Sequence, residues 1–340
     1  MSFLVHIQPG DLEFTVEPGE TVLDAALRQR IGLPYSCRGG TCGSCVGDLL
    51  AGTVVYPSGA PDALTGLGPQ ACALCQAVPT ADLTCRLDSL NRQSAHAPRI
   101  LPCRVEGVDH LNHDVARLYL KLPDGQRLPF QAGQYLDFLL KDGQRRAFSI
   151  ANPPHDDALI ELHIRHVPGG AFTDYVFEQL HTKEILRIQA PLGRFTLVEP
   201  EGRPLLFLAG GTGFAPIKGM LEQLFFSHVR CTKLLYWGVR ARRDLYLPDL
   251  PKTWASEQAG FRYVPVLSEP DPDWDGRTGF VHQAVMDDLA DLSHFDIYMA
   301  GPPVMVHAAR DSFIAAGADP ARMFSDAFEY APKPPKEPLT

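Results

Sequence analysis

The residues of this 340-residue chain with the clearest chemical meaning lie in a short cysteine loop. The loop reads SCRGGTCGSC over residues 36–45, with four residues between Cys37 and Cys42 and two between Cys42 and Cys45. Thiolates at this spacing are typical of plant-type [2Fe-2S] clusters, whose fourth ligand lies further along the chain. The glycines of the loop permit backbone conformations that turn N–H groups toward a negatively charged cluster.

Two cysteines could supply the fourth ligand. Cys72 and Cys75 are separated by two residues, and periodicity does not distinguish between them. The pairs Cys42/Cys45 and Cys72/Cys75 could also form a zinc site. That alternative leaves Cys37 without a role, and the spacer of 26 residues is longer than usual for zinc. The pattern therefore favours an iron–sulfur centre. The other cysteines fit ordinary core positions: Cys85, Cys103 and Cys231.

A second candidate site is a glycine turn in the last third of the chain. The apolar run 205–209 precedes the turn GGTGFAP at 210–216, and an expected helix follows. Such a turn brings backbone N–H groups and a helix N-terminus to the pyrophosphate of a dinucleotide. Pro216 stands where the common fingerprint has its third glycine, so a tight turn without a ligand is the alternative. Gly238 and Gly301 follow other expected strands and could line the same crevice.

The middle of the chain contains a third group of candidate residues. The segment RRAFS at 145–149 places two arginines beside an aromatic side chain and a hydroxyl. Arginine suits pyrophosphate recognition, and an aromatic ring can stack on a planar cofactor. The turn VPGGAFT at 167–173 leads into a helix-like run and offers N–H groups to a phosphate. The alternative for the first segment is a solvent-exposed strand end.

Different sequence patterns surround these three groups. Alternating apolar residues on both sides of Pro9-Gly10 predict a hairpin, and a helix is expected over 22–29. Short alternating runs over 100–198 predict an antiparallel barrel or sandwich. Strands and helices alternate after residue 205, which indicates a parallel α/β sheet.

Composition restricts the class of protein. Lys and Arg total 31 and Asp and Glu total 40, so the formal net charge is −9, which disfavours binding to nucleic acid. Residues 1–95 contain nine acidic residues, five arginines and no lysine. No secretory signal or membrane-length apolar run is visible. We therefore expect a cytoplasmic protein that binds neither nucleic acid nor membrane.

Five phrases of this sequence resemble one family: YSCRGGTCGSC, RRAFSIANPP, RHVPGG, LAGGTGFAPIKGM and FSDAF. The chain is similar to ferredoxin–FAD–NAD reductase components, which include the reductases of ring-hydroxylating oxygenases, of terephthalate dioxygenases and of CDP-6-deoxy-3,4-glucoseen. The resemblance implies an α+β multidomain fold. Its expected parts are a β-grasp [2Fe-2S] domain at 1–92, an antiparallel FAD-binding β-barrel at 99–199, a parallel α/β NAD(P)-binding domain at 200–330 and a Pro-rich tail at 331–340.

The resemblance also implies roles for single residues. The fourth cluster cysteine of the family precedes a glutamine, which selects Cys75, followed by Gln76, over Cys72. The metal ligands expected are thus Cys37, Cys42, Cys45 and Cys75. Arg146 is expected to hold the FAD pyrophosphate, Phe148 to pack on the flavin, and Ser149 and Phe328 to lie near its reacting part. The other expected cofactor-binding residues are His163, Ile164, Gly170, Ala171, Thr173, Gly211, Thr212, Gly213, Pro216, Gly238, Gly301 and Met305. Ala300 stands where many relatives have cysteine.

The function implied is that of an iron–sulfur flavoprotein oxidoreductase. Hydride passes from NADH to FAD, and single electrons leave through the [2Fe-2S] cluster to a terminal oxygenase or another one-electron acceptor protein. NADPH is an alternative reductant, because three arginines that follow Gly238 could bind its 2′-phosphate: Arg240, Arg242 and Arg243. We expect a monomer. The alternatives are a reductase of dideoxysugar synthesis, a direct NAD(P)H–flavin reductase without a protein partner, and a zinc-stabilised binding module.

Overall fold

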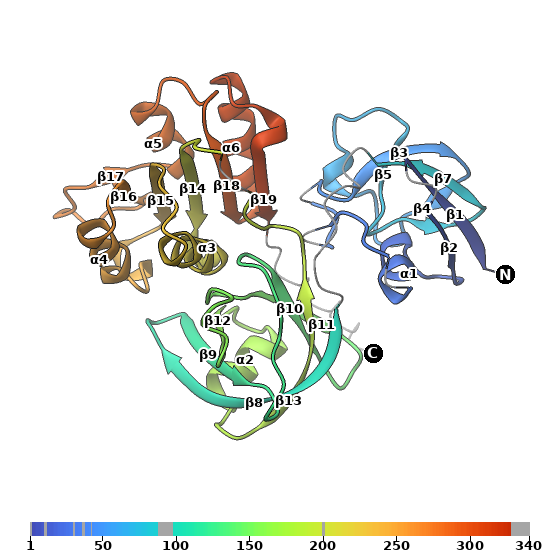
Figure 1. Ribbon diagram of the computed structural model, residues 1–340, viewed down its shortest axis with the longest axis horizontal. Coiled ribbons are helices and arrows are strands. Elements are labelled where there is room, and N and C mark those ends of the chain that lie inside the picture. The colour runs from blue at the N-terminus through green and yellow to red at the C-terminus, as the bar shows by residue number, and fades with distance from the viewer. Residues whose placement is uncertain are drawn as a thin grey trace, which may run out of the picture. The chain divides into compact units, whose positions relative to one another are not determined.

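Three main β-sheets make up the computed structural model, which describes residues 2–9, 12–29, 31–35, 38–41, 43–87, 98–198 and 201–327 (Figure 1). The chain divides into two compact units. The first contains Met1–Arg99 with Pro191–Phe195, and the second contains Ile100–Ala190 with Thr196–Thr340. Within the described residues, no helix has the length and apolar character needed to cross a membrane.

The first unit is built on a mixed five-stranded sheet of order β2-β1-β7-β3-β5. Its strands are β1 (Phe3–Gln8), β2 (Leu12–Val16), β3 (Val46–Ala51), β5 (Ala71–Ala73) and β7 (Leu83–Arg86). A small sheet pairs β4 (Val54–Val55) with β6 (Val78–Pro79), and a 3-10 turn, η1, spans Asp62–Leu64. The predicted hairpin is confirmed by the antiparallel β1/β2 pair. Helix α1 (Val22–Arg28) begins after Thr21, whose hydroxyl accepts a hydrogen bond from the Asp24 N–H at 3.1 Å.

A six-stranded antiparallel barrel forms the first half of the second unit, in the order β11-β10-β13-β8-β9-β12. Its strands are β8 (Arg99–His110), β9 (Val115–Lys121), β10 (Tyr135–Leu139), β11 (Arg145–Ser149), β12 (Ile160–Arg165) and β13 (Ile185–Leu192). An isolated antiparallel bridge between Ile150 and Leu162 joins the two outer strands and closes the sheet. Phe172 and Val176 of α2 (Ala171–Glu178) belong to the buried cluster that fills the barrel.

The second half of this unit is a parallel six-stranded sheet of order β17-β16-β15-β14-β18-β19. Its strands are β14 (Leu205–Gly210), β15 (Lys233–Val239), β16 (Phe261–Leu267), β17 (Arg277–Thr278), β18 (Asp296–Gly301) and β19 (Met323–Ala327). The helices are α3 (Phe214–Phe226), α4 (Asp249–Glu257), α5 (Val281–Asp288) and α6 (Pro303–Ala315), with 3-10 turns η2 (Gly211–Gly213), η3 (Arg242–Asp244) and η4 (Pro320–Arg322). The strand order reverses between β14 and β18, which is where ligands bind in open α/β sheets.

Candidate functional site

Cys45 of the loop and Cys75 lie at one end of an antiparallel strand pair. Cys45 directly precedes β3 and Cys75 follows β5, with Val46 opposite Ala73 in the register. The Leu74 N–H donates to the Cys45 carbonyl oxygen at 3.2 Å. Both cysteines are buried, and the strand pairing brings them to the same place. The other two expected ligands, Cys37 and Cys42, lie outside the described residues.

The loop backbone adopts the conformations that its glycines permit. Residues Arg38, Gly40 and Gly43 have φ values of 58°, 85° and 76°. A Cβ on Gly40 would lie 2.9 Å from the Pro61 Cβ, so a larger residue does not fit there. The Gln76 side-chain amide donates to the Arg38 carbonyl oxygen at 2.6 Å, which ties the loop to the residue after Cys75. This loop fits a group held by Cys45 and Cys75.

Cys72 has a different environment. The Tyr56 hydroxyl donates to the Cys72 sulfur at 3.7 Å. A hydrogen bond between the Cys85 and Cys72 thiols lowers the pKa of Cys72 and raises that of Cys85 well above its ordinary value. Cys72 therefore contacts side chains of the core.

The arginine–aromatic–serine group lies on β11, where Phe138 and Leu136 of β10 oppose Arg146 and Phe148. The half-buried Phe148 ring lies 5.8 Å from that of Phe138 and 5.6 Å from that of Phe172. Ser149 is buried at the end of the strand. The Arg146 guanidinium donates to the Gln144 side chain at 2.5 Å, and Arg146 is only partly exposed, between the exposed residues Arg145 and Ala147.

The PGG turn leads into α2 as expected. The Thr173 hydroxyl lies 3.1 Å from the Val167 N–H, the Val167 carbonyl and the Gly170 carbonyl, so it crosses the turn. A Cβ on Gly170 would approach that hydroxyl to 2.8 Å, so the turn requires glycine. Phe172, in the first turn of α2, contacts Phe148 and brings this turn beside β11.

A cavity of about 470 Å³ opens at the carboxyl ends of the parallel strands. Four of the expected dinucleotide residues line it: Gly211, Thr212, Gly238 and Met305. Gly213 and Gly301 are not among the residues that line the cavity. A Cβ on Gly213 would overlap the Ala300 carbonyl, and one on Gly301 would lie 3.0 Å from the Gly210 Cα. These two glycines let η2 pack directly on β18. Pro216, within the first turn of α3, is buried behind them.

The cavity wall contains residues that the sequence analysis missed. Asp114 and Arg165 reach it from the barrel, and the Arg165 Nε donates to the Asp114 carboxylate at 2.8 Å. A Cβ on Gly211 would lie 3.6 Å from the Arg165 guanidinium. Tyr246 and the exposed ring of Phe280 line other parts of the wall. The RHVPGG phrase contains Arg165 and was the available signal for it.

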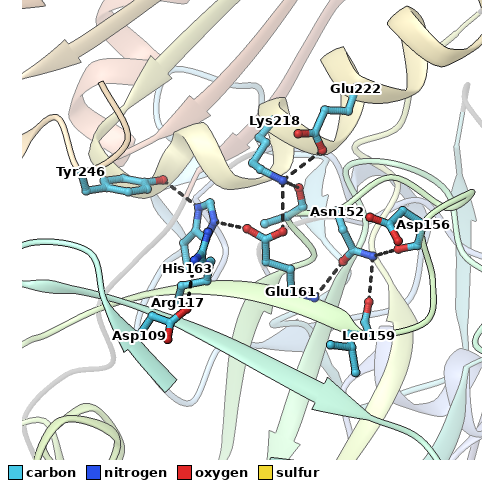
Figure 2. Close-up of polar contacts among 11 residues, drawn as sticks. Asp109, Arg117, Asn152, Asp156, Leu159, Glu161, His163, Lys218, Glu222 and Tyr246 are labelled. Carbon is cyan, nitrogen blue, oxygen red and sulfur yellow. Dashed lines mark hydrogen bonds and ion pairs between the residues drawn. The ribbon is translucent and has the colours of Figure 1, made fainter. Parts of the chain in front are cut away.

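A network of buried polar side chains begins at Tyr246 of the cavity wall (Figure 2). His163 is fully buried. Its Nδ1 accepts from the Tyr246 hydroxyl at 3.0 Å, and its Nε2 donates to Glu161 at 2.8 Å. The other Glu161 oxygen accepts from the Lys218 ammonium at 3.1 Å, and Lys218 also donates to Glu222 at 3.0 Å.

The charge states of these buried side chains follow from their contacts. Burial lowers the pKa of His163 and keeps the ring neutral. Burial opposes the charge of Glu161, but the hydrogen bond from His163 and the attraction of Lys218 lower its pKa to about 2. Burial likewise opposes the charge of Lys218, and Glu161 and Glu222 raise its pKa. Glu161 and Lys218 therefore form a buried ion pair.

Comparisons with known proteins match this architecture. Family models fit residues 5–80 (2Fe-2S iron-sulfur cluster binding domain), 102–197 (oxidoreductase FAD-binding domain) and 207–311 (oxidoreductase NAD-binding domain). A CDP-6-deoxy-L-threo-D-glycero-4-hexulose-3-dehydrase reductase of Yersinia pestis is 38% identical over 328 residues, 96% of this chain and 99% of that protein. Terephthalate 1,2-dioxygenase reductase component 2 of Comamonas sp is 36% identical over 333 residues, 98% of this chain and 99% of that protein.

Solved structures agree. The Amycolatopsis cytochrome P450 reductase GcoB superposes with a TM-score of 0.82 at 35% identity, covering 96% of this chain and 99% of that one. The ferredoxin reductase in carbazole 1,9a-dioxygenase gives 0.73 at 27% identity, covering 96% and 98%. The chain belongs to the family of iron–sulfur flavoprotein reductases that unite a 2Fe-2S domain with FAD-binding and NAD-binding oxidoreductase domains. It is an NAD(P)H-dependent electron-transfer oxidoreductase with FAD and a [2Fe-2S] cluster, as the sequence predicted.

Proposed function

We propose that this protein is the reductase component of an enzyme system and delivers single electrons to a separate acceptor protein, foremost a ring-hydroxylating Rieske-type oxygenase. When bound, the flavin divides the two-electron reductant NADH into single electrons for the cluster. One observation supports the proposal most: the chain adds a cluster-binding domain to its flavin and dinucleotide domains. A two-electron flavin reductase has no need of a one-electron relay.

We propose that Cys37, Cys42, Cys45 and Cys75 hold the cluster. The shared position of Cys45 and Cys75 at the ends of β3 and β5 supports this ligand set. The core contacts of Cys72 with Tyr56 and Cys85 argue against Cys72 as the fourth ligand.

For the flavin we propose a site along β11 and the start of α2. Arg146 would bind the pyrophosphate, Phe148 would pack on the ring system, and Ser149 would lie near its reacting part. The contact between Phe148 and Phe172 supports this assignment because it joins the strand to the phosphate turn. The remaining residues proposed for the FAD site are His163, Ile164, Gly170, Ala171, Thr173 and Phe328, of which Phe328 lies outside the described residues.

For the nicotinamide dinucleotide we propose the 470 Å³ cavity. Gly211, Thr212, Gly238 and Met305 would contact it directly. Gly213, Pro216 and Gly301 would shape the turn from behind. We propose NADH as the preferred reductant. Arg242 forms an ion pair with Asp273 at 3.3 Å, whereas Arg240 lines the cavity, so the preference for NADH rests on the family resemblance and NADPH is the alternative.

We further propose the domain boundaries 1–92, 99–199 and 200–330, followed by a tail at 331–340. Each of the three sheets lies within one of these intervals, which supports them. We propose a monomer that acts in the cytoplasm and binds neither nucleic acid nor membrane. The net charge of −9 is in keeping with the last point.

The test is reconstitution of electron transfer. Purified protein should show flavin and cluster absorption bands that NADH bleaches, and NADH oxidation should accelerate when a Rieske-type oxygenase is added. A sugar dehydrase is the second candidate acceptor, favoured by the 38% identity to the dehydrase reductases. Acceleration by the dehydrase alone would select that alternative. Fast NADH oxidation with free flavin and with neither protein would indicate a direct flavin reductase.

A further inference from the structure

Lys218 connects the start of the dinucleotide-binding helix to the barrel. Helix α3 begins directly after the glycine turn η2, and Lys218 lies in its second turn. The side chain is only 7% exposed. Its ammonium donates to the Glu161 carboxylate of β12 at 3.1 Å (Figure 2). It also donates to the Ala151 carbonyl oxygen at 3.3 Å. One side chain thus contacts two segments of the barrel.

The barrel segment that Lys218 contacts directly follows β11. Ala151 stands two residues after Ser149, and its N–H donates to the Glu161 carbonyl oxygen at 2.8 Å. A Cβ on Gly219 would lie 2.9 Å from the Asn152 carbonyl oxygen, so the backbone of α3 approaches the same segment closely. Any shift of α3 would therefore move the glycine turn relative to Ser149.

Glu161 receives a second connection from the α/β half. While one carboxylate oxygen accepts from Lys218, the other accepts from His163, whose ring in turn accepts from Tyr246 in the cavity wall. A further cross-contact runs from the Asn112 side-chain amide to the Arg243 carbonyl oxygen at 2.8 Å. Glu161 is thus the residue at which α3 and the Tyr246 loop both meet the barrel.

A buried ion pair is a poor means of gaining stability alone. Removing two charges from water is costly, and replacing a buried ion pair by apolar residues of similar volume often leaves the protein equally stable or more stable. What such a pair provides is a fixed geometry, because each group must keep its partner within hydrogen-bond distance. A reaction between two bound reactants depends on such a fixed geometry, because a displacement of about 1 Å can slow it about 100-fold.

We propose that Lys218 and Glu161 are positioning residues that set the distance between the dinucleotide cavity and the flavin-binding strand β11. The proposal rests on the cavity and β11 being the NADH and FAD sites. Lys218 is 7% exposed and is not part of the cavity lining, so it acts through Ala151 and α3. Its loss should slow the reduction of the flavin at saturating NADH, while binding of the dinucleotide stays nearly unchanged.

The experiment compares three variants of the full-length holoprotein. Lys218→Met leaves Glu161 as a buried carboxylate without its ammonium. The double variant Glu161→Gln/Lys218→Met removes both charges at nearly constant volume, so thermal stability should return. The matched control is Lys233→Met, because Lys233 is also buried, at 3% exposed, and donates within the α/β half, to the carbonyls of Val229 and Cys231.

We expect Lys218→Met and the double variant to reduce their flavin at least 10-fold more slowly than wild type at saturating NADH. The dissociation constant of NAD⁺ should stay within twofold of the wild-type value. Amide hydrogen exchange over 149–152 should rise in both, and Lys233→Met should change neither quantity. Recovery of the wild-type flavin-reduction rate together with stability in the double variant would overturn the proposal. If wild-type protein itself is not bleached by NADH, the proposed function fails instead.

Discussion

The Phe148 ring lies 5.6 Å from the Phe172 ring, with an angle of 39° between their planes. This contact joins the end of β11 to the first turn of α2, so two segments that are separated by some twenty residues form one continuous surface of the barrel. Both rings also contact Phe138 in the barrel interior. The surface proposed for the flavin is therefore anchored in the hydrophobic core.

Replacing Phe172 should affect stability and flavin retention together. Phe172 is 4% exposed, and truncating such a buried ring to alanine costs about 3–5 kcal/mol of unfolding free energy. We expect Phe172→Ala to lose this amount in denaturant titrations and to purify with less FAD. Ile185→Ala is the control, because Ile185 is 65% exposed and its loss should change stability by less than about 0.5 kcal/mol. Full flavin content in a destabilised Phe172→Ala protein would separate the two roles and contradict the anchoring argument.

Gly213 should tolerate no side chain. An added Cβ would overlap the Ala300 carbonyl and lie 2.9 Å from the Gly301 nitrogen, both of which belong to the backbone. Gly213→Ala must therefore displace the turn η2 from β18, and we expect the KM for NADH to rise at least 10-fold while FAD content is retained. Gly68→Ala is the control, since nothing lies within 4 Å of its added Cβ. An unchanged KM in Gly213→Ala would show that the turn does not position the dinucleotide.

The buried His163 should make the protein less stable in mild acid. Burial holds the pKa of its ring below the ordinary value of 6.5, so the folded protein keeps it neutral while the unfolded chain takes up a proton. Because the unfolded state then binds more protons, stability should fall as the pH drops below about 6.5. The charged and titratable groups that act on this ring are Glu161, Lys218, Arg117 and Tyr246.

The measurement is the denaturant midpoint of wild type and His163→Gln at pH 7.5 and 5.5. The loss on acidification should be smaller in the variant. His282, whose pKa burial also lowers, is present in both proteins and does not affect the comparison. Stability losses of equal size in the two proteins would mean that His163 is protonated in the folded state.

Electron transfer to the partner should depend on ionic strength. The lysine-free segment 1–95 has nine acidic residues against five arginines, so attraction to a basic partner surface would speed association at low salt. Salt screens exposed charges beyond about 8 Å at physiological ionic strength, so turnover with the partner should fall as salt rises. Reduction of a small uncharged quinone measures the salt response of the other steps. Partner reduction that is insensitive to salt would contradict electrostatic docking.

Local patterns in the sequence were sufficient for the motifs and most of the elements. The hairpin, α1, the four barrel strands β9, β10, β11 and β12 and the β14–η2–α3 unit all follow from periodicity and turn residues, whereas no pattern singled out β8 and β13. The helix expected after the turn at 210–216 already begins at Phe214, because η2 passes directly into α3. The sequence gives no clear signal for the strands β16 and β19, because their apolar runs are short and interrupted by polar residues or proline.

Contacts between distant segments were beyond the sequence. Lys218 and Glu161 are 57 positions apart, and no local pattern indicates that β12 and α3 meet. The same applies to Asp114 and Arg165 in the cavity wall, which come from the barrel rather than from the α/β sheet. The proximity of Cys45 and Cys75 likewise depends on the antiparallel register of β3 and β5, which their spacing along the chain does not reveal.

The barrel is closed at β11 and β12 by an isolated bridge between Ile150 and Leu162, rather than by a continuous ladder. Beside this bridge, single contacts satisfy the edge of β12: the Ala151 N–H donates to the Glu161 carbonyl oxygen, and the Glu161 N–H donates to the Asn152 side chain, both at 2.8 Å. The edge of a sheet is a template for pairing with other chains unless it is paired or covered. The short segment after β11 therefore also protects the edge of β12 against pairing with a second molecule.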